Sequence, residues 1–137
     1  MASRKLEDLS PEMRVMAISF LAHCRVEGID LLVTCTARSN AEQAQLYAQG
    51  RTAPGRRVTN ARPGESAHNV TGEGGKAAAE ALDVVPLRGG KPVWEDTDPI
   101  WLRVGEIGKS VGMKWGGDWQ TFKEYPHFQN QTWEAPH

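Results

Sequence analysis

The hydrophobic positions of the chain follow helical spacing in two stretches. In the first, Val15, Ile18, Leu21 and Ala22 are spaced three or four residues apart, and the pattern predicts a helix over residues 11–26. Ser10-Pro11 is typical of a helix start, because Ser caps the first turn and Pro needs no hydrogen bond there. The second stretch follows Asp98-Pro99 and places Ile100, Val104, Ile107 and Val111 on one stripe.

A third helix is predicted from a cap more than from a stripe. Ser39 and Glu42 form a capping box, in which Ser is followed three residues later by Glu. The helix that it opens should run to about Gln49 and stop at Gly50. From Gly50 to Gly75 the chain is rich in Gly, Pro, Arg, Thr and Asn, which predicts a long loop; such loops in compact domains are functional or disordered.

Short runs of β-branched and apolar residues predict the strands. Together with the helices they indicate an α+β fold, in which helices pack on a small, mainly antiparallel sheet. We find no internal repeat, and we expect residues 1–137 to form a single domain. The predicted strands are Leu31–Thr36, Ala81–Leu87, Pro92–Trp94 and Tyr125–Gln129, with an irregular turn at Trp115–Trp119.

Composition narrows the class of protein. The 137 residues are 39% hydrophobic and 24% charged, with a net charge of −1, which is typical of a globular protein and argues against a nucleic-acid partner. The polar N-terminus lacks the order of regions of a signal peptide, and no stretch is long enough for a transmembrane segment. We therefore expect a protein made in the cytoplasm, with Cys24 and Cys35 as buried free thiols.

Asp83 is the first candidate for chemistry. It lies within the apolar run Ala81-Leu82-Asp83-Val84-Val85, where a strand is predicted and Asp is depleted. A buried carboxylate is costly unless it is paired or binds a metal. A salt bridge to Arg or Lys is the alternative that the sequence leaves open.

Two of the four histidines stand in places that suit ligands. His68 follows Ser66 in the long loop, and His127 lies among aromatic residues, whereas His23 within the first helix is expected to be structural and His137 is terminal. Either histidine alone would more often be structural. Two histidines with an isolated strand carboxylate match the three-ligand pattern of a catalytic zinc site, which keeps one position open.

Glu124 is the candidate general base. It precedes His127 by three residues, and in a regular strand positions three apart face opposite sides. The two side chains can share a site only if the chain bends between them, and Pro126 makes such a break plausible. The alternative is a solvated surface acid.

At these residues the chain resembles the zinc D,D-carboxypeptidase and L-alanyl-D-glutamate endopeptidase family, which includes many phage endolysins. The resemblance runs from about Leu31 to Gln129, and all its motifs occur in order. The matching segments are Thr36-Ala37-Arg38-Ser39 with Gln43, Ser66-Ala67-His68, Ala81-Leu82-Asp83, Trp115-Gly116-Gly117-Asp118-Trp119 and Glu124-Tyr125-Pro126-His127.

The resemblance implies a D,D-peptidase, hedgehog-like fold and a set of roles. His68, Asp83 and His127 would bind Zn²⁺, and Glu124 would be the catalytic base and then acid. Arg38 would hold a substrate oxygen and stabilise charge, and Ser66 and Gln43 would help to bind substrate. A strand-end salt bridge for Arg38 and a plain loop position for Ser66 remain alternatives.

One departure from the family pattern concerns spacing. The His and Asp ligands are usually closer together, with a Gly two residues before the Ala, where this chain has Ala79. Here an apparent insertion at residues 70–80 separates them, and it brings Glu73 and Glu80 as rival acids. It is expected to be a lid over the cleft or a substrate loop.

The expected function is a zinc peptidase that cuts peptidoglycan stem peptides. The preferred bond is L-alanyl-D-glutamate, in a monomeric phage endolysin that reaches the cell wall after release from the cytoplasm. A D-alanyl-D-alanine carboxypeptidase and a non-catalytic peptidoglycan-binding zinc domain are the alternatives. A hydrolase with Cys24 or Cys35 as nucleophile is disfavoured, because neither has an electropositive setting.

Overall fold

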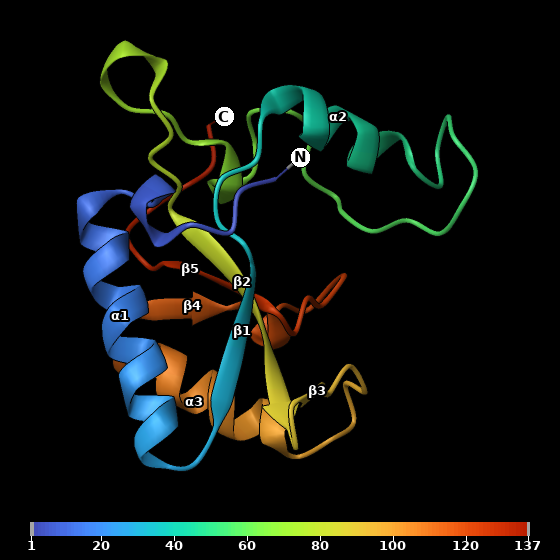
Figure 1. Ribbon diagram of the computed structural model, residues 1–137. Coiled ribbons are helices and arrows are strands. Elements are labelled where there is room, and N and C mark those ends of the chain that lie inside the picture. The colour runs from blue at the N-terminus through green and yellow to red at the C-terminus, as the bar shows by residue number, and fades with distance from the viewer. Residues whose placement is uncertain (1, 137) are drawn as a thin grey trace.

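The computed structural model describes residues 2–136 and shows helices packed against a five-stranded sheet (Figure 1). All strand pairings are antiparallel, in the order β1-β2-β5-β4, with β3 paired to β2. The predicted α+β class is therefore confirmed. The strands are β1 (Asp30–Cys35), β2 (Ala81–Arg88), β3 (Lys91–Pro92), β4 (Met113–Trp115) and β5 (His127–Asn130); the α-helices are α1 (Pro11–Val26), α2 (Asn40–Ala48) and α3 (Ile100–Ser110).

The helix boundaries follow the local signals. The Ser10 side chain accepts a hydrogen bond from Met13 N at the start of α1, and Ser39 and Glu42 form the predicted capping box of α2. Short 3₁₀ turns complete the inventory: η1 (Leu6–Asp8), η2 (Ala67–Asn69), η3 (Glu73–Gly75) and η4 (Gly116–Asp118). No helix among residues 2–136 is long and apolar enough to cross a membrane.

The buried face of α1 differs from the apolar stripe that marked the helix in the sequence. Val15 and Ile18 are 69% and 55% exposed, whereas Met13 and Phe20 are completely buried. The helix has apolar residues on two sides, and the side with the large Phe20 ring packs inward. Periodicity identified the helix but not the face that it buries.

Strand boundaries show three further differences. The strand expected at Pro92–Trp94 is β3 at Lys91–Pro92, which leaves Trp94 in a loop. Met113–Trp115 form β4, a strand that the sequence did not predict. The last strand begins at His127 instead of Tyr125, because Tyr125 and Pro126 form a turn.

The core lies between the sheet and helices α1 and α3. Phe128 of β5 packs against Phe20 of α1, with ring centroids 4.7 Å apart, and stacks on Trp115 at 6.3 Å. On α3, Gly105 and Gly108 let the helix approach these rings, since a Cβ atom at Gly108 would lie 2.4 Å from Phe128. This packing fixes β5 and turns the side chains that alternate with Phe128 toward the opposite face.

The insertion at residues 70–80 forms a compact excursion (light green in Figure 1). Gly72 N donates to Lys76 O at 2.7 Å, and Ala78 N donates to Val70 O at 3.0 Å. None of its residues lines the main cleft described below, so in this structure it is not a lid.

Candidate active site

The pairing register places three chemically active residues in one row across the sheet. Asp83 on β2 lies opposite Cys35 of β1 on one side and opposite His127 of β5 on the other. Residues paired directly across strands point to the same face. The row therefore faces away from the Phe128 side of the sheet, and Asp83 occupies its centre.

His68 joins this row from the 3₁₀ turn η2. Ser66 caps that turn, and its Oγ accepts a hydrogen bond from His68 N at 3.2 Å. The imidazole is buried; its Nδ1 donates to Thr36 O at 2.6 Å, and its Nε2 lies 3.1 Å from Asp83 Oδ1. The backbone acceptor keeps a proton on Nδ1 and turns Nε2 toward Asp83.

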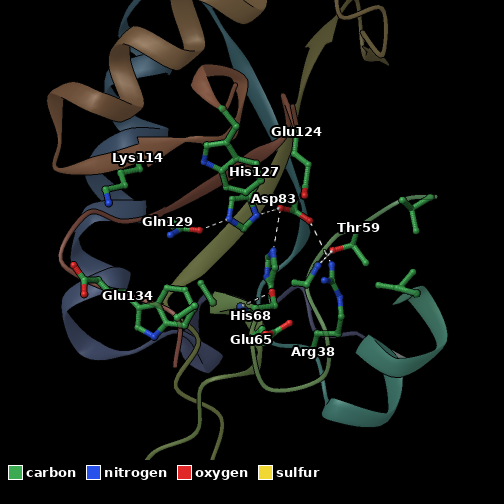
Figure 2. A pocket seen from close by; sticks show the side chains of 18 residues that line it. Arg38, Thr59, Glu65, His68, Asp83, Lys114, Glu124, His127, Gln129 and Glu134 are labelled. Carbon is green, nitrogen blue, oxygen red and sulfur yellow. Dashed lines mark hydrogen bonds and ion pairs between the residues drawn. The ribbon is translucent and has the colours of Figure 1, made fainter. Parts of the chain in front are cut away.

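His127 presents its other nitrogen to the same oxygen. Its Nε2 donates to Gln129 Oε1 at 2.7 Å, while Nδ1 lies 3.3 Å from Asp83 Oδ1 (Figure 2). This Nδ1 is buried and makes no hydrogen bond within residues 2–136. Trp119 shields the ring, with centroids 5.1 Å apart. A buried ring nitrogen without a donor is the state expected of a metal ligand.

Two of the three distances between these atoms are close to those around a tetrahedral metal ion. Ligand bonds of about 2.0–2.2 Å at tetrahedral angles separate neighbouring ligand atoms by about 3.3–3.6 Å. The distances of 3.1 and 3.3 Å from Asp83 Oδ1 to the two imidazole nitrogens are close to this range. The donor set of two imidazoles and one carboxylate suits zinc.

Cys35 offers a second possible ligand on the same row. The ligand atoms of Cys35, His68 and Asp83 lie within 4.8 Å of one another. However, Cys35 Sγ lies 3.7 Å from Nδ1 of His68, the nitrogen that already donates to Thr36. A ligand set of His68, Asp83 and His127 uses only ring nitrogens that face Asp83. A ligand set with Cys35 in place of His127 would compete with the hydrogen bond from His68 Nδ1 to Thr36 O.

Asp83 and His68 stabilise each other in their charged forms. Burial alone favours the neutral form of both groups, but each charge outweighs it for the other. The Asp83 carboxylate thus raises the pKa of His68, and the imidazolium holds the pKa of Asp83 far below its usual range. A bound cation would replace the proton of His68, since both groups bind metal in their deprotonated forms.

Arg38 follows β1 and reaches the other oxygen of Asp83. Its Nη2 lies 3.6 Å from Asp83 Oδ2, and its Nη1 donates to Gln43 Oε1 at 2.9 Å. Gln43 is completely buried on α2 and also donates to Ala61 O at 2.8 Å. Arg38 therefore makes the salt bridge that the sequence left open for Asp83 and also lines the cleft, while Gln43 holds its guanidinium.

Glu124 lies in the same cleft because the chain bends as the sequence required. His127 N donates to Glu124 O at 3.2 Å across the turn at Tyr125 and Pro126. Burial raises the pKa of Glu124, although the neighbouring His127 and His68 oppose this effect. Gly116 underlies the bend, and its O accepts from Glu124 N at 3.1 Å. A half-buried carboxyl with a raised pKa is suited to proton transfer.

The cleft has a volume of about 540 Å³. Glu73 and Glu80 do not line it, so neither rival acid belongs to the site; the Glu80 carboxylate accepts a hydrogen bond from Ser10. His23 is exposed on α1, and His137 lies outside the described residues. The residues that line the cleft include Arg38, Ser66, His68, Asp83, Glu124 and His127, with Glu65, Lys114, Trp119, Gln129, Trp133 and Glu134 (Figure 2).

Cys24 and Cys35 are buried and unpaired, as expected from the sequence. Burial raises the pKa of Cys24 to about 12. A thiol with such a pKa is a poor nucleophile near neutral pH.

Sequence reasoning did not find Gln129 or Lys114. His127 and Gln129 are two positions apart on β5, so period-two alternation would have put both on the cleft face. Lys114 lies opposite Gln129 on β4, the strand that was missed.

Comparison with known proteins shows the family of this chain. Residues 59–130 match the family model described as D-alanyl-D-alanine carboxypeptidase. The chain belongs to this family, whose members are metallopeptidases.

One relative is much closer in sequence than the similar solved structures. The peptidoglycan L-alanyl-D-glutamate endopeptidase CwlK of Bacillus subtilis is 40% identical over 129 residues, which cover 89% of this chain and 73% of that protein. The L-Ala D-Glu endopeptidase ChiX of Serratia marcescens has a TM-score of 0.65 at 21% identity, covering 96% of this chain and 89% of that one. The LD-carboxypeptidase LdcB has a TM-score of 0.64 at 18% identity, covering 89% and 58%. At identities of 21% and 18%, the similarity to ChiX and LdcB supports the fold of this chain and nothing further.

Proposed function

We propose that this protein is a zinc-dependent peptidase that hydrolyses the L-alanyl-D-glutamate bond of peptidoglycan stem peptides. The observation that carries the proposal is the 40% identity to an enzyme named for this bond, in a chain whose cleft joins His68, Asp83, His127 and Glu124. The two histidines and Asp83 are the proposed metal ligands, because Nε2 of His68 and Nδ1 of His127 face one carboxylate oxygen.

The chain's own residues divide the remaining work. When bound, zinc supplies a Lewis acid that polarises a carbonyl and acidifies water. Glu124 takes a proton from the attacking water and delivers it to the leaving amine, for which its raised pKa suits it. Arg38, held by Gln43, donates to the carbonyl oxygen as negative charge develops. Ser66 fixes the turn that carries His68 and presents its edge to substrate.

The second candidate is a D-alanyl-D-alanine carboxypeptidase, because the matching family model carries that description. Both reactions use the same proposed ligands and base. They differ in the products, which are a new amino-terminal D-glutamate for the endopeptidase and free D-alanine for the carboxypeptidase.

The test combines metal content with product analysis. We expect one zinc per chain, clearing of purified peptidoglycan that a chelator abolishes, and new D-glutamate amino termini by mass spectrometry. Release of D-alanine alone would establish the carboxypeptidase. Zinc with peptidoglycan binding but no cleavage would indicate the non-catalytic binding domain, and the absence of metal would refute the central proposal.

Matched variants separate the proposed roles. Glu124→Gln should keep the metal and lose most activity, whereas Glu73→Gln, an exposed acid of the excursion, should keep both. His68→Ala should lose the metal, whereas His23→Ala on the exposed face of α1 should retain it. If Glu124→Gln cleaves at the rate of the unaltered protein, the assignment of the base is wrong.

The endolysin role is a separate proposal. A monomer of this size would diffuse to the cell wall once the membrane is breached. Purified protein added to permeabilised bacteria should therefore lower the turbidity of the culture, and Glu124→Gln should not. Peptide cleavage without loss of turbidity would leave the peptidase proposal intact and refute the lytic role.

A further inference from the structure

A second pocket adjoins the proposed active site and differs from it in character. It has a volume of about 360 Å³ and shares Asp83, Glu124 and His127 with the main cleft. We call it the aromatic pocket. The residues that line only this side include Trp94, Asp96, Trp101, Phe122, Lys123 and Tyr125.

The aromatic pocket joins the edge of the core, to which Trp101 belongs, with the exposed ring of Trp94. Trp94 follows β3 and is 56% exposed, although a large aromatic side chain gains free energy by burial. Phe122 has φ of 48°, a conformation that is rare for a residue with a side chain. Trp101 is buried, and its indole N–H has no acceptor within residues 2–136. Exposed, strained and unpartnered groups in one pocket indicate a binding site.

The main cleft and the aromatic pocket differ in the number of charged side chains that each adds to the shared residues. The main cleft carries the cations Arg38 and Lys114 together with Glu65 and Glu134, which suits the charged part of a peptide. The aromatic pocket adds four aromatic side chains but only one acid and one base, Asp96 and Lys123. A substrate with one charged half and one largely neutral half would lie across the proposed metal site, with its charged half in the main cleft and its neutral half in the aromatic pocket.

The proposed substrate has two such halves. On the amine side of the L-alanyl-D-glutamate bond lie the carboxylates of the stem peptide. On the carbonyl side lie only L-alanine and a short lactyl link to a neutral, N-acetylated amino sugar. Two units at about 3.5 Å each place the sugar roughly 7 Å from the scissile bond. The aromatic pocket adjoins the proposed metal site, because Asp83 and His127 line both.

We propose that the aromatic pocket binds this N-acetylated amino sugar, so that the enzyme prefers stem peptides that are still attached to glycan. The face of an indole ring carries partial negative charge and attracts the C–H groups of a sugar ring and its acetyl methyl. Asp96 can accept from a hydroxyl or amide N–H, and Lys123 can donate to a carbonyl. The inference rests on the proposed function.

The experiment compares two substrates that differ only in the sugar. One is a disaccharide-linked stem peptide, and the other is the same peptide with an N-acetylated L-alanine, which keeps the amide. We expect kcat/KM to be at least about tenfold higher for the sugar-linked peptide, the effect of one good aromatic contact. For Trp94→Ala, the two values should come within about threefold of each other.

Two control variants make the comparison specific. Leu102→Ala removes a side chain that is 61% exposed on α3 and should leave both values unchanged. Trp133→Ala removes an aromatic residue from the main cleft and should lower both values equally. Equal values for the two substrates in the unaltered protein, or an equal loss in Trp94→Ala, would overturn the inference.

A binding measurement keeps this inference distinct from the proposed function. The inactive Glu124→Gln protein is titrated with the disaccharide alone, and the indole N–H signals are followed by NMR. The Trp94 and Trp101 signals should shift, and the Trp133 signal should not. Failure to cleave either substrate would refute the proposed function, whereas shifts confined to Trp133 would refute the sugar site.

Discussion

Replacing Gly116 by Ala tests whether the bend beneath Glu124 positions the catalytic base. A Cβ atom at Gly116 would lie 2.3 Å from Glu124 O and 3.1 Å from the Cβ of His127. Ordinary contacts begin near 3.4 Å, so the Glu124 backbone must move by about 1 Å. The neighbouring atom is backbone and cannot swing aside as a side chain end can.

We expect Gly116→Ala to lower activity more than it lowers metal binding. A displacement of about 1 Å in a reacting group costs on the order of 100-fold in rate. We therefore expect kcat/KM to fall by about 10- to 100-fold, with a loss of stability of about 1–3 kcal/mol from overpacking. The three proposed metal ligands keep their contacts, so zinc content should stay near one per chain.

The assay measures kcat/KM on the sugar-linked peptide, zinc content and thermal unfolding of the same preparation. Gly72→Ala is the matched control, because its Cβ atom would meet its nearest neighbour at 3.5 Å, an ordinary contact. Activity of Gly116→Ala within about twofold of the unaltered protein would refute the reasoning, since the required shift is far larger than catalysis tolerates. Loss of zinc would show that the bend supports His127 instead.

Three further predictions follow from contacts around the site. Gln129→Leu removes the acceptor of His127 Nε2–H and should weaken zinc binding by about 10- to 100-fold, measured in competition with a chelator. The control Gln131→Leu should bind zinc as the unaltered protein does. Equal zinc affinities of the two variants would contradict this prediction. Gly108→Ala forces a Cβ atom to 2.4 Å from Phe128 and should destabilise the protein by about 1–3 kcal/mol in urea unfolding, and an unchanged midpoint would argue against tight packing there. Because burial raises the pKa of Glu124 and a base acts only when deprotonated, kcat/KM should fall with decreasing pH through a value above 4.5; an acid limb at or below 4.5 would contradict this.

Features set by neighbours in the chain could be read from the sequence. The caps at Ser10 and Ser39 act within one helical turn, and the predicted helix starts agree with the structure. The isolation of Asp83 in an apolar strand also signalled a buried carboxylate that needs partners. Its partners proved to be both a guanidinium and two imidazoles, which the strand itself does not specify.

Features that depend on pairing between distant segments could not be read in this way. The three residues of β4 are too few to show a period, and the choice of α1 face depends on which side meets Phe128. The excursion at residues 70–80 has no sequence pattern that predicts where it lies; backbone hydrogen bonds to Asp8 and Ala67 fix the position of its end.

The sequence by itself determined the residue types of the proposed site, their order and the helices and strands that carry most of them. Only the tertiary structure decided which nitrogen of each histidine faces Asp83, that Gln43 holds Arg38, and that an aromatic pocket adjoins the base. The physical reason is the distance along the chain over which each interaction acts. Caps and strand propensity act over a few residues, whereas the site forms where antiparallel register and helix packing bring residues 35, 68, 83 and 127 together.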